Sequence, residues 1–392
     1  MDTSPKHPNE NPNQIPNPLL SAYDLGPLRL PNRVVMAPMT RLRADRDGVP
    51  TELMAAYYTQ RASAGLIVSE GIAPSVAGQQ YLTEPGLYSA EQVQGWRRVT
   101  DAVHAAGGRI FAQLMHAGRG GHPANRPDGG TPVAPSAVPR TDLVHTLDGK
   151  VAPVTPRALT TGEIARTVTE YADAARAALR AGFDGVEIHG ANGYLPHQFL
   201  ADNTNLRTDA YGGGTSGRVR FPVEVAEAVA DAVGADRVGL RLSPGNRQFE
   251  MVERDPAPVY RELLRRIAPL GLAYLHVTED PRHPALAEAR RDWSGTLVGN
   301  TGEHEVTTPQ SAAALLGEGR ADLVSVGRPY IANPDVVERL AAGVPWARIR
   351  EKDFHYTSGA RGYADYPRHD EASGTSGNGL VGGNERLVAP LT

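Results

Sequence analysis

Short apolar segments recur along the chain, and each of them ends at glycine or polar residues. In the segment 185–189, apolar Val186 and Ile188 occupy alternate positions, which is the period of a β-strand because successive side chains point to opposite faces. Seven other segments have the same character: 33–40, 66–71, 109–114, 238–243, 273–278, 296–300 and 323–327. The pattern therefore predicts eight strands.

Helical patterns separate these strands. Thr160 and Glu163 form a capping-box signature, and apolar residues follow them at helical spacing as far as Gly182. Five strands come after a glycine that we expect to end the preceding helix: Gly65, Gly107, Gly182, Gly271 and Gly319. Eight strand–helix units predict an α/β fold, a (β/α)8 TIM barrel, with an open doubly wound sheet as the alternative.

The chain is expected to form one domain over residues 19–370. Its segment 118–155 holds many glycines and prolines without a helical period, so we expect it to cap the barrel mouth after the third strand. The segments 1–18 and 371–392 are expected to be disordered or flexible tails because polar residues and glycine or proline dominate them. The segment 245–258 is expected to form a mobile lid.

Charge and composition exclude several classes of function. The 392 residues carry a formal net charge of −4 without a block of basic residues, so neither nucleic acid nor a membrane surface is an expected partner. The absence of cysteine excludes disulfides, iron–sulfur clusters and cysteine nucleophiles, and no metal site is predicted. With no signal peptide or membrane-spanning stretch apparent, we expect a cytoplasmic protein that acts on small molecules. A monomer and a homodimer both stay open.

Candidate catalytic residues follow the fourth strand. His189, Asn192 and Tyr194 lie just past its carboxyl end, where parallel α/β proteins place their active sites. Each residue alone is better explained as a turn or packing residue. Two hydrogen-bond donors and a phenol within one turn of chain together favour a catalytic site.

In the third, fourth and fifth predicted strands, one residue that faces away from the apolar ones is polar: Gln113, His189 and Arg241. Burying the glutamine and the arginine is unfavourable unless they meet a polar partner. We expect that partner to be a ligand with several hydrogen-bond acceptors. As an alternative, Arg241 pairs inside the protein with a carboxylate such as Glu187.

The last two strands end in sequences suited to phosphate. Gly299 and Asn300 end the seventh strand, and Gly327 and Arg328 end the eighth. Glycine allows backbone N–H groups to approach phosphate oxygens, and an arginine can bind them through two parallel hydrogen bonds. The two strand ends together predict a phosphate-bearing cofactor.

Long motifs in a fixed order carry a family resemblance. They lie at 36–41, 111–114, 188–195, 203–211, 239–244, 326–334 and 362–367, so that the resemblance covers about 20–367. Through these motifs the chain resembles the old yellow enzyme family of FMN-dependent NAD(P)H ene reductases, in its classical, N-ethylmaleimide reductase-like branch. Thr40 in the first motif and Asn192 in the third are the residues that favour this branch.

The resemblance implies tightly bound, non-covalent FMN and NADPH or NADH as the reductant. Gln113 would pair with the pyrimidine edge of the flavin, and Arg241 would stabilise charge near N1. The implied FMN-binding residues are Pro38, Met39, Thr40, Gly71, Gln113, Arg241, Gly299, Asn300, Gly327 and Arg328. Met115 stands where classical relatives usually carry tryptophan, and His355 where they often carry phenylalanine.

The resemblance also implies reduction of the C=C bond of enones, enals, maleimides and nitroalkenes, and some relatives reduce nitrate esters. His189 and Asn192 would bind the substrate oxygen, and Tyr194 would protonate the α-carbon after hydride transfer from flavin N5 to the β-carbon. Tyr81 and Tyr356 match aromatic positions around the substrate. Each of these two tyrosines is also explained by packing.

Three other classes of protein fit the sequence less well. Dienoyl-CoA reductases with a related barrel need cluster-binding cysteines, which this chain lacks. A phosphate-binding aldolase or isomerase barrel usually needs a Schiff-base lysine or a metal, and Lys6, Lys150 and Lys352, the only lysines, lie on no predicted strand end. A flavin-binding protein without turnover would leave Tyr194 without a role.

Overall fold

Eight parallel strands close into a barrel in the computed structural model, which describes residues 17–147, 149–302, 304–350, 356 and 359–371. The strands are β3 (Val34–Met36), β4 (Leu66–Ile72), β5 (Ile110–Leu114), β10 (Gly185–His189), β11 (Val238–Leu242), β12 (Tyr274–Thr278), β13 (Leu297–Asn300) and β14 (Leu323–Val326). They pair in chain order, and β14 closes the barrel against β3. The predicted TIM barrel is confirmed, and the open doubly wound sheet is wrong.

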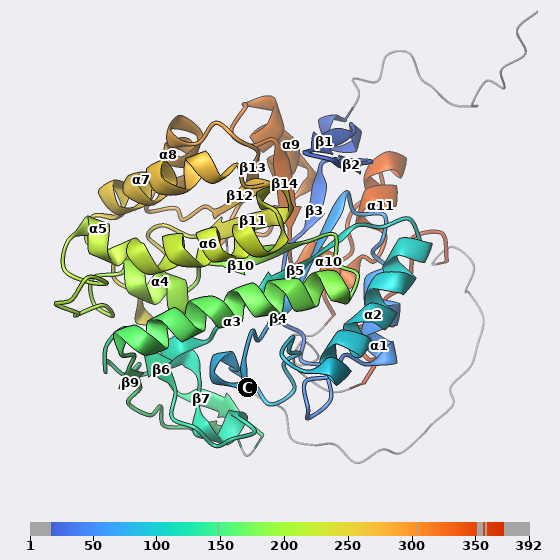
Figure 1. Cartoon of the computed structure of the whole chain (residues 1–392). Helices are drawn as coiled ribbons and strands as arrows, with labels where there is room; N and C mark the ends of the chain where they lie inside the picture. The colour runs from blue at the N-terminus through green and yellow to red at the C-terminus, as the bar shows by residue number, and fades with distance from the viewer. Residues whose placement is uncertain (1–16, 148, 303, 351–355, 357–358, 372–392) are drawn as a thin grey trace, which may run out of the picture.

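Helices surround the barrel, as Figure 1 shows. They are α1 (Glu52–Thr59), α2 (Ala90–Ala105), α3 (Thr161–Arg180), α4 (Leu195–Leu200), α5 (Thr215–Arg218), α6 (Arg220–Val233), α7 (Pro256–Ile267), α8 (Ala285–Asp292), α9 (Pro309–Gly317), α10 (Pro329–Ala332) and α11 (Val336–Ala342). The predicted capping box opens α3, because the Glu163 N–H donates to Thr160 Oγ1 at 3.2 Å and the Thr160 N–H donates to Glu163 Oε2 at 2.8 Å. Within the described ranges, no helix combines the length and the apolar character that a membrane span requires.

The barrel interior is apolar at one end and polar at the other. Side chains from the first half of the strands, among them Val35, Val68 and Phe111, form an apolar cluster with the hairpin of β1 (Tyr23–Leu25) and β2 (Leu28–Leu30). This hairpin covers the amino ends of the strands. Any polar ligand must therefore bind at the carboxyl ends, where the interior residues are polar.

Four of the five predicted helix-ending glycines have a positive φ. These four are Gly107, Gly182, Gly271 and Gly319, with φ between 66° and 90°. The prediction is wrong for Gly65, which lies well past the end of α1 and has no positive φ. A Cβ at Gly65 would lie 2.2 Å from the carbonyl oxygen of Asn32, so glycine is needed there for a close approach of two backbone segments.

Among its described residues, the segment 118–155 contains two single-turn 3-10 helices, η3 (Gly118–Gly120) and η4 (Pro123–Asn125), and most of two short sheets, but no α-helix. In one, β6 (Val133–Ala134) pairs with β9 (Arg157–Ala158), and in the other β7 (Val144–Thr146) pairs with β8 (Gly149–Val151). Its contacts reach the 245–258 segment: Arg119 Nη2 donates to the carbonyl oxygen of Phe249 at 2.5 Å, and the Thr141 N–H donates to Glu250 Oε2 at 2.9 Å. The excursion therefore packs on the expected lid.

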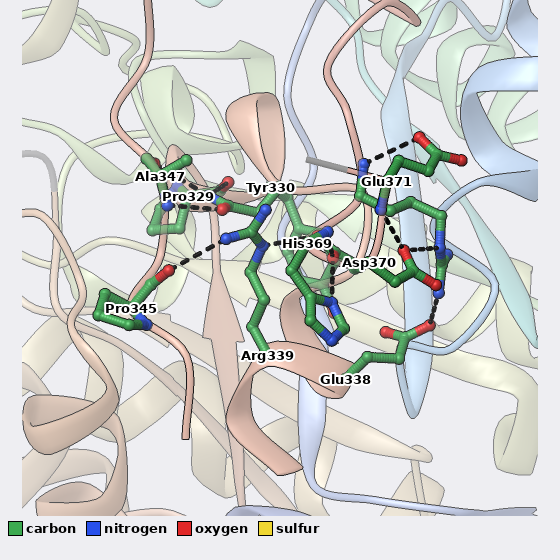
Figure 2. A network of polar contacts seen from close by, with 12 residues as sticks. Pro329, Tyr330, Glu338, Arg339, Pro345, Ala347, His369, Asp370 and Glu371 are labelled. Carbon is green, nitrogen blue, oxygen red and sulfur yellow. Dashed lines mark hydrogen bonds and ion pairs between the residues drawn. The ribbon is translucent and has the colours of Figure 1, made fainter. Parts of the chain in front are cut away.

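The C-terminal segment 359–371 is held against α11 by hydrogen bonds and an ion pair, as Figure 2 shows. The buried carboxylate of Asp335 accepts hydrogen bonds from Arg339 Nε at 2.8 Å and from the His369 N–H at 2.7 Å. Arg368 pairs with Glu338 at 2.9 Å. Asn17 caps the turn η1 (Pro18–Leu20), while the rest of the two predicted tails, 1–16 and 372–392, lies outside the described residues.

Candidate active site at the carboxyl ends of the strands

A cavity of about 560 Å³ opens at the carboxyl ends of the strands. Its volume lies within the roughly 300–1,000 Å³ that is usual for small-molecule sites. It brings together most of the residues that the sequence predicted: Pro38, Met39, Thr40, Tyr81, Gln113, His189, Asn192, Tyr194, Arg241, Asn300, Gly327, Arg328 and Tyr356. These residues come from most of the strand ends and from two separate loops.

His189 is the last residue of β10 and is presented as a neutral hydrogen-bond donor. Its Nδ1 accepts from the Ala191 N–H at 3.3 Å, so the ring proton is placed on Nε2. Burial, together with the charge of Arg241, holds the pKa of His189 well below its usual range. The ring therefore offers an N–H donor without a positive charge.

The turn after β10 places Asn192 and Tyr194 beside His189. Asn192 adopts a left-handed conformation with a φ of 53°, and its N–H donates to Ser243 Oγ at 2.8 Å. The Tyr194 ring lies 4.6 Å from the His189 ring between centroids and 5.7 Å from the Phe249 ring. Among the described residues, the buried Oδ1 of Asn192 has no hydrogen-bond partner. Such an atom is typical of a side chain that binds a ligand.

A buried carboxylate supports the loop after β3 that carries Thr40. Glu70 Oε2 accepts from the N–H groups of Arg41 and Leu42, both at 3.3 Å, and Leu42 has a φ of 57°. Tyr58 donates to Glu70 Oε1 at 3.2 Å. The position of Thr40 in the cavity therefore depends on β4 and α1, and not only on its own strand.

Gln113 and Arg241 lie at the cavity floor. Gln113 Nε2 donates to Glu187 Oε1 at 2.8 Å, and Arg241 Nη2 donates to Thr278 Oγ1 at 3.1 Å. Burial alone would raise the pKa of Glu187, but contacts with His276, Arg241 and Gln113 hold that pKa below its usual range. The charge of Arg241 thus helps to lower the pKa of Glu187, and Arg241 also lines the cavity.

The seventh and eighth strands form the other end of the cavity. Asn300 Nδ2 donates to the carbonyl oxygen of Ser325 at 3.1 Å, while Asn300 Oδ1 accepts from the Gly302 N–H at 2.9 Å. Arg328 Nη2 donates to the carbonyl oxygen of Glu305 at 2.7 Å. This end therefore offers a guanidinium and a glycine-rich turn.

Two predicted glycines lie next to this cavity without lining it. A Cβ at Gly71 would lie 2.5 Å from Met115 Sδ, so this glycine makes room for Met115, which does line the cavity. A Cβ at Gly299 would lie 2.9 Å from the Cβ of Ala321, on the side of the helices. Contacts of these two glycines through backbone atoms stay predictions.

Tyr81 and Tyr356 lie at the cavity rim. Burial, and next the phenol of Tyr356, raises the pKa of Tyr81. The loop of Tyr81 is fastened by Glu84, whose Oε2 accepts from the N–H groups of Gln80 at 2.7 Å and Tyr81 at 3.1 Å. His355, singled out in the sequence, lies outside the described residues.

Several lining residues were not predicted as site residues. Gln248 and Phe249 reach the cavity from the 245–258 segment, whose lining role has no local signal in the sequence. Gly302 and Thr307 also line it, beyond the seventh strand. Of these lining residues, Gly302 has a local signal in the sequence, because it is a glycine two residues after Asn300. Glycine permits the φ of 89° that the chain adopts there.

Comparison with known proteins identifies the family of this chain. The family described as NADH:flavin oxidoreductase / NADH oxidase matches residues 18–346. The chain belongs to this family. The membership confirms the prediction of an FMN-dependent oxidoreductase of the old yellow enzyme type.

Members of the NADH:flavin oxidoreductase / NADH oxidase family align with nearly the whole chain. A probable flavin mononucleotide-dependent alkene reductase of Leishmania infantum is 43% identical over 89% of this chain and 97% of the relative. The 12-oxophytodienoate reductase 7 of Oryza sativa subsp. japonica is 40% identical over 92% of this chain and 97% of its own. Both are named as reductases.

Solved structures of the NADH:flavin oxidoreductase / NADH oxidase family share the fold. Morphinone reductase superposes with a TM-score of 0.85 at 42% identity, covering 92% of this chain and 99% of its own. The old yellow enzyme homologue from Zymomonas mobilis has a TM-score of 0.85 at 41% identity, covering 89% and 99%. One structure of morphinone reductase contains tetrahydroNAD.

Proposed function

We propose that this chain reduces the C=C bond of activated alkenes, such as enones, enals, maleimides and nitroalkenes, with bound FMN and with NADPH or NADH as the reductant. One observation carries the proposal: His189, Asn192 and Tyr194 line the same cavity as Gln113 and Arg241. Donors for a substrate oxygen thus lie beside donors for a cofactor. The relatives named as alkene and 12-oxophytodienoate reductases support the same chemistry.

The donor set fits FMN. Gln113 and Arg241 would hold the polar edge of the flavin ring, because they are the amide and the cation at the cavity floor. Pro38, Met39 and Thr40 would line the ring from the loop after β3. Asn300, Gly327 and Arg328 would hold the phosphate, with Gly71 and Gly299 adding backbone contacts, since a guanidinium and glycine turns suit phosphate oxygens.

When bound, FMN supplies the hydride that adds to the β-carbon of the alkene. As negative charge then builds on the substrate carbonyl or nitro oxygen, the Nε2–H of His189 and the amide of Asn192 stabilise it by hydrogen bonds. A half-turn of the Asn192 amide exchanges its oxygen and nitrogen, so this group can present a donor. One such preorganised donor contributes about 3 kcal/mol to the transition state.

Tyr194 completes the addition. Its hydroxyl donates a proton to the α-carbon, so that the alkene gains one hydride and one proton and becomes the saturated product. General acid catalysis of this kind contributes roughly 10²- to 10⁴-fold in rate. Tyr81 and Tyr356 would contact the substrate from the rim, which makes the rim a place where substrates are distinguished.

The cytoplasmic location and the monomeric or homodimeric state stay predictions.

Visible absorption spectroscopy tests the proposal. The purified protein should be yellow with one FMN per chain, lose its colour under anaerobic NADPH, and regain it when cyclohexenone is added. Loss of colour without recovery would keep the flavin reduction and exclude this enone as a substrate. Failure to bind added FMN would overturn the proposal.

A further inference from the structure

A continuous chain of hydrogen bonds runs through the barrel below the cavity. Gln113 Nε2 donates to Glu187 Oε1 at 2.8 Å, and Glu187 Oε2 lies 2.8 Å from His276 Nδ1. His276 Nε2 lies 2.7 Å from Ser325 Oγ, which accepts from Asn300 Nδ2 at 2.9 Å. Gln113 and Asn300 at the two ends line the cavity, whereas the three middle residues are completely buried.

The direction of every bond in this chain follows from Glu187. An ionised carboxylate only accepts hydrogen bonds, so His276 Nδ1 must carry the ring proton that it donates. Burial and the charge of Arg241 lower the pKa of His276 despite the adjacent carboxylate, so the ring is neutral. His276 Nε2 is therefore an acceptor, and Ser325 must donate to it.

The two amides at the ends are oriented in consequence. Because Gln113 gives one Nε2–H to Glu187, its carbonyl oxygen and its second Nε2–H remain for a ligand. Because Ser325 Oγ donates its own proton to His276, it can only accept from Asn300, whose Oδ1 then receives the Gly302 N–H. The buried charge thus orients Gln113 directly, and it supports an orientation of Asn300 that the Ser325 carbonyl oxygen and the Gly302 N–H also favour.

We propose that Glu187 is a positioning residue for the cofactor: it orients the amide of Gln113 directly and supports that of Asn300 through this chain, and its charge offsets that of Arg241 at the floor of the cavity. This inference rests on the proposed function. A purely structural role would not require the charge, since buried ionic networks are often replaced by apolar residues without loss of stability. A network with both ends in a cavity is better explained by what it presents there.

Tyr274 provides a matched control. Its hydroxyl donates to Glu187 Oε2 at 3.0 Å, but Tyr274 does not line the cavity. It reaches the carboxylate past Gly239, where a Cβ would lie 2.3 Å from the tyrosine ring. Tyr274→Phe therefore removes one hydrogen bond to Glu187. The charge of Glu187 and its contacts with Gln113 and His276 are kept.

The test compares FMN dissociation constants and flavin midpoint potentials of Glu187→Gln, Tyr274→Phe and the unaltered protein. Glu187→Gln should weaken FMN binding by about tenfold or more, since it removes a charged acceptor. It should also shift the potential to more positive values, because loss of a negative charge favours the more negative, reduced flavin. Tyr274→Phe should leave both quantities unchanged and lower only the Tm.

Ser325→Ala tests the half of the hydrogen-bond chain that ends at Asn300. This variant can be measured even if Glu187→Gln does not fold. It should weaken the binding of FMN but not of riboflavin, which lacks the phosphate, and should leave the potential unchanged. Equal losses for FMN and riboflavin would overturn the role of this chain in presenting Asn300 to the phosphate.

The outcomes separate the inference from the proposed function. If the unaltered protein binds no FMN, the proposed function is overturned, and the inference with it. If it binds FMN and reduces cyclohexenone, but Glu187→Gln has the same FMN affinity and potential, only the role of Glu187 is overturned. A lowered Tm as the sole effect of both Glu187→Gln and Tyr274→Phe would likewise show a structural role.

Discussion

His197 Nδ1 accepts a hydrogen bond of 2.9 Å from the backbone N–H of Gly193. The helix α4 places this ring directly behind the turn that carries Tyr194. His197 Nε2 lies 3.4 Å from Glu253 Oε2, and the same carboxylate oxygen accepts from the Gly245 N–H at 2.7 Å. The catalytic turn and the 245–258 segment are therefore held against each other by one buried histidine and one buried carboxylate.

We expect His197→Leu to slow the reduction of the alkene by about tenfold or more, since small displacements of a reacting group have large effects. The substitution leaves the Gly193 N–H buried without an acceptor, so the turn should shift. The rate of flavin reduction by NADPH should change less. Stopped-flow measurement of both half-reactions checks this.

The control for this variant is His104→Leu. His104 pairs with Asp184 at 3.1 Å but lies at the end of α2, away from the cavity. His104→Leu should leave the rates of both half-reactions unchanged. Equal effects of the two substitutions would contradict a specific role of His197.

Tyr194→Phe should lower the rate of alkene reduction by roughly 10²- to 10⁴-fold, because the phenol proton is lost while the ring keeps its contacts with His189 and Phe249. FMN binding and flavin reduction by NADPH should persist. Single-turnover oxidation of the reduced enzyme by cyclohexenone measures the effect. Full alkene reduction by this variant would exclude Tyr194 as the proton donor.

His189→Ala should slow alkene reduction by about 10²- to 10³-fold and weaken the binding of phenols, whose oxygen resembles the charged substrate oxygen. Since the pKa of His189 is held well below 6.5 by burial and by Arg241, this ring should stay neutral as the pH falls through 6.5. Phenol titrations followed by visible absorption, at several pH values, test both statements. Unchanged phenol affinity in the variant would contradict the assignment.

Glu84→Gln should alter how stability depends on pH. Burial raises the pKa of Glu84 from 4.5 to about 8, so between these values the folded state binds a proton that the unfolded state has lost. This contribution to stability is complete below about pH 4.5 and is lost as the pH rises through about 8. The variant, which cannot ionise, should therefore gain stability relative to the unaltered protein as the pH rises.

The upper limit of that gain is about 5 kcal/mol, at about 1.4 kcal/mol for each unit of pKa. Thermal unfolding at a series of pH values measures it. Glu52→Gln serves as the control, because the Glu52 side chain is 82% exposed. The same pH dependence of Tm in the Glu84 and Glu52 variants would show that Glu84 is not buried as described.

Local patterns in the sequence were sufficient to predict the barrel. The strand expected at 185–189 is β10, and the capping box of Thr160 and Glu163 opens α3. Both signals depend only on residues a few positions apart, because strand alternation and helix capping are local interactions. His189, Asn192 and Tyr194 could be predicted for the same reason, since one turn of chain holds them together.

The tertiary structure alone decided which buried groups meet. Glu187, His276 and Ser325 lie on β10, β12 and β14, and no spacing in the sequence links them. Gly65 resembles a helix-ending glycine, yet it is required because Asn32 approaches it from another segment. Contacts of this kind depend on the register of strands and on closure of the barrel, which bring together residues that are distant along the chain, and so local sequence patterns do not specify them.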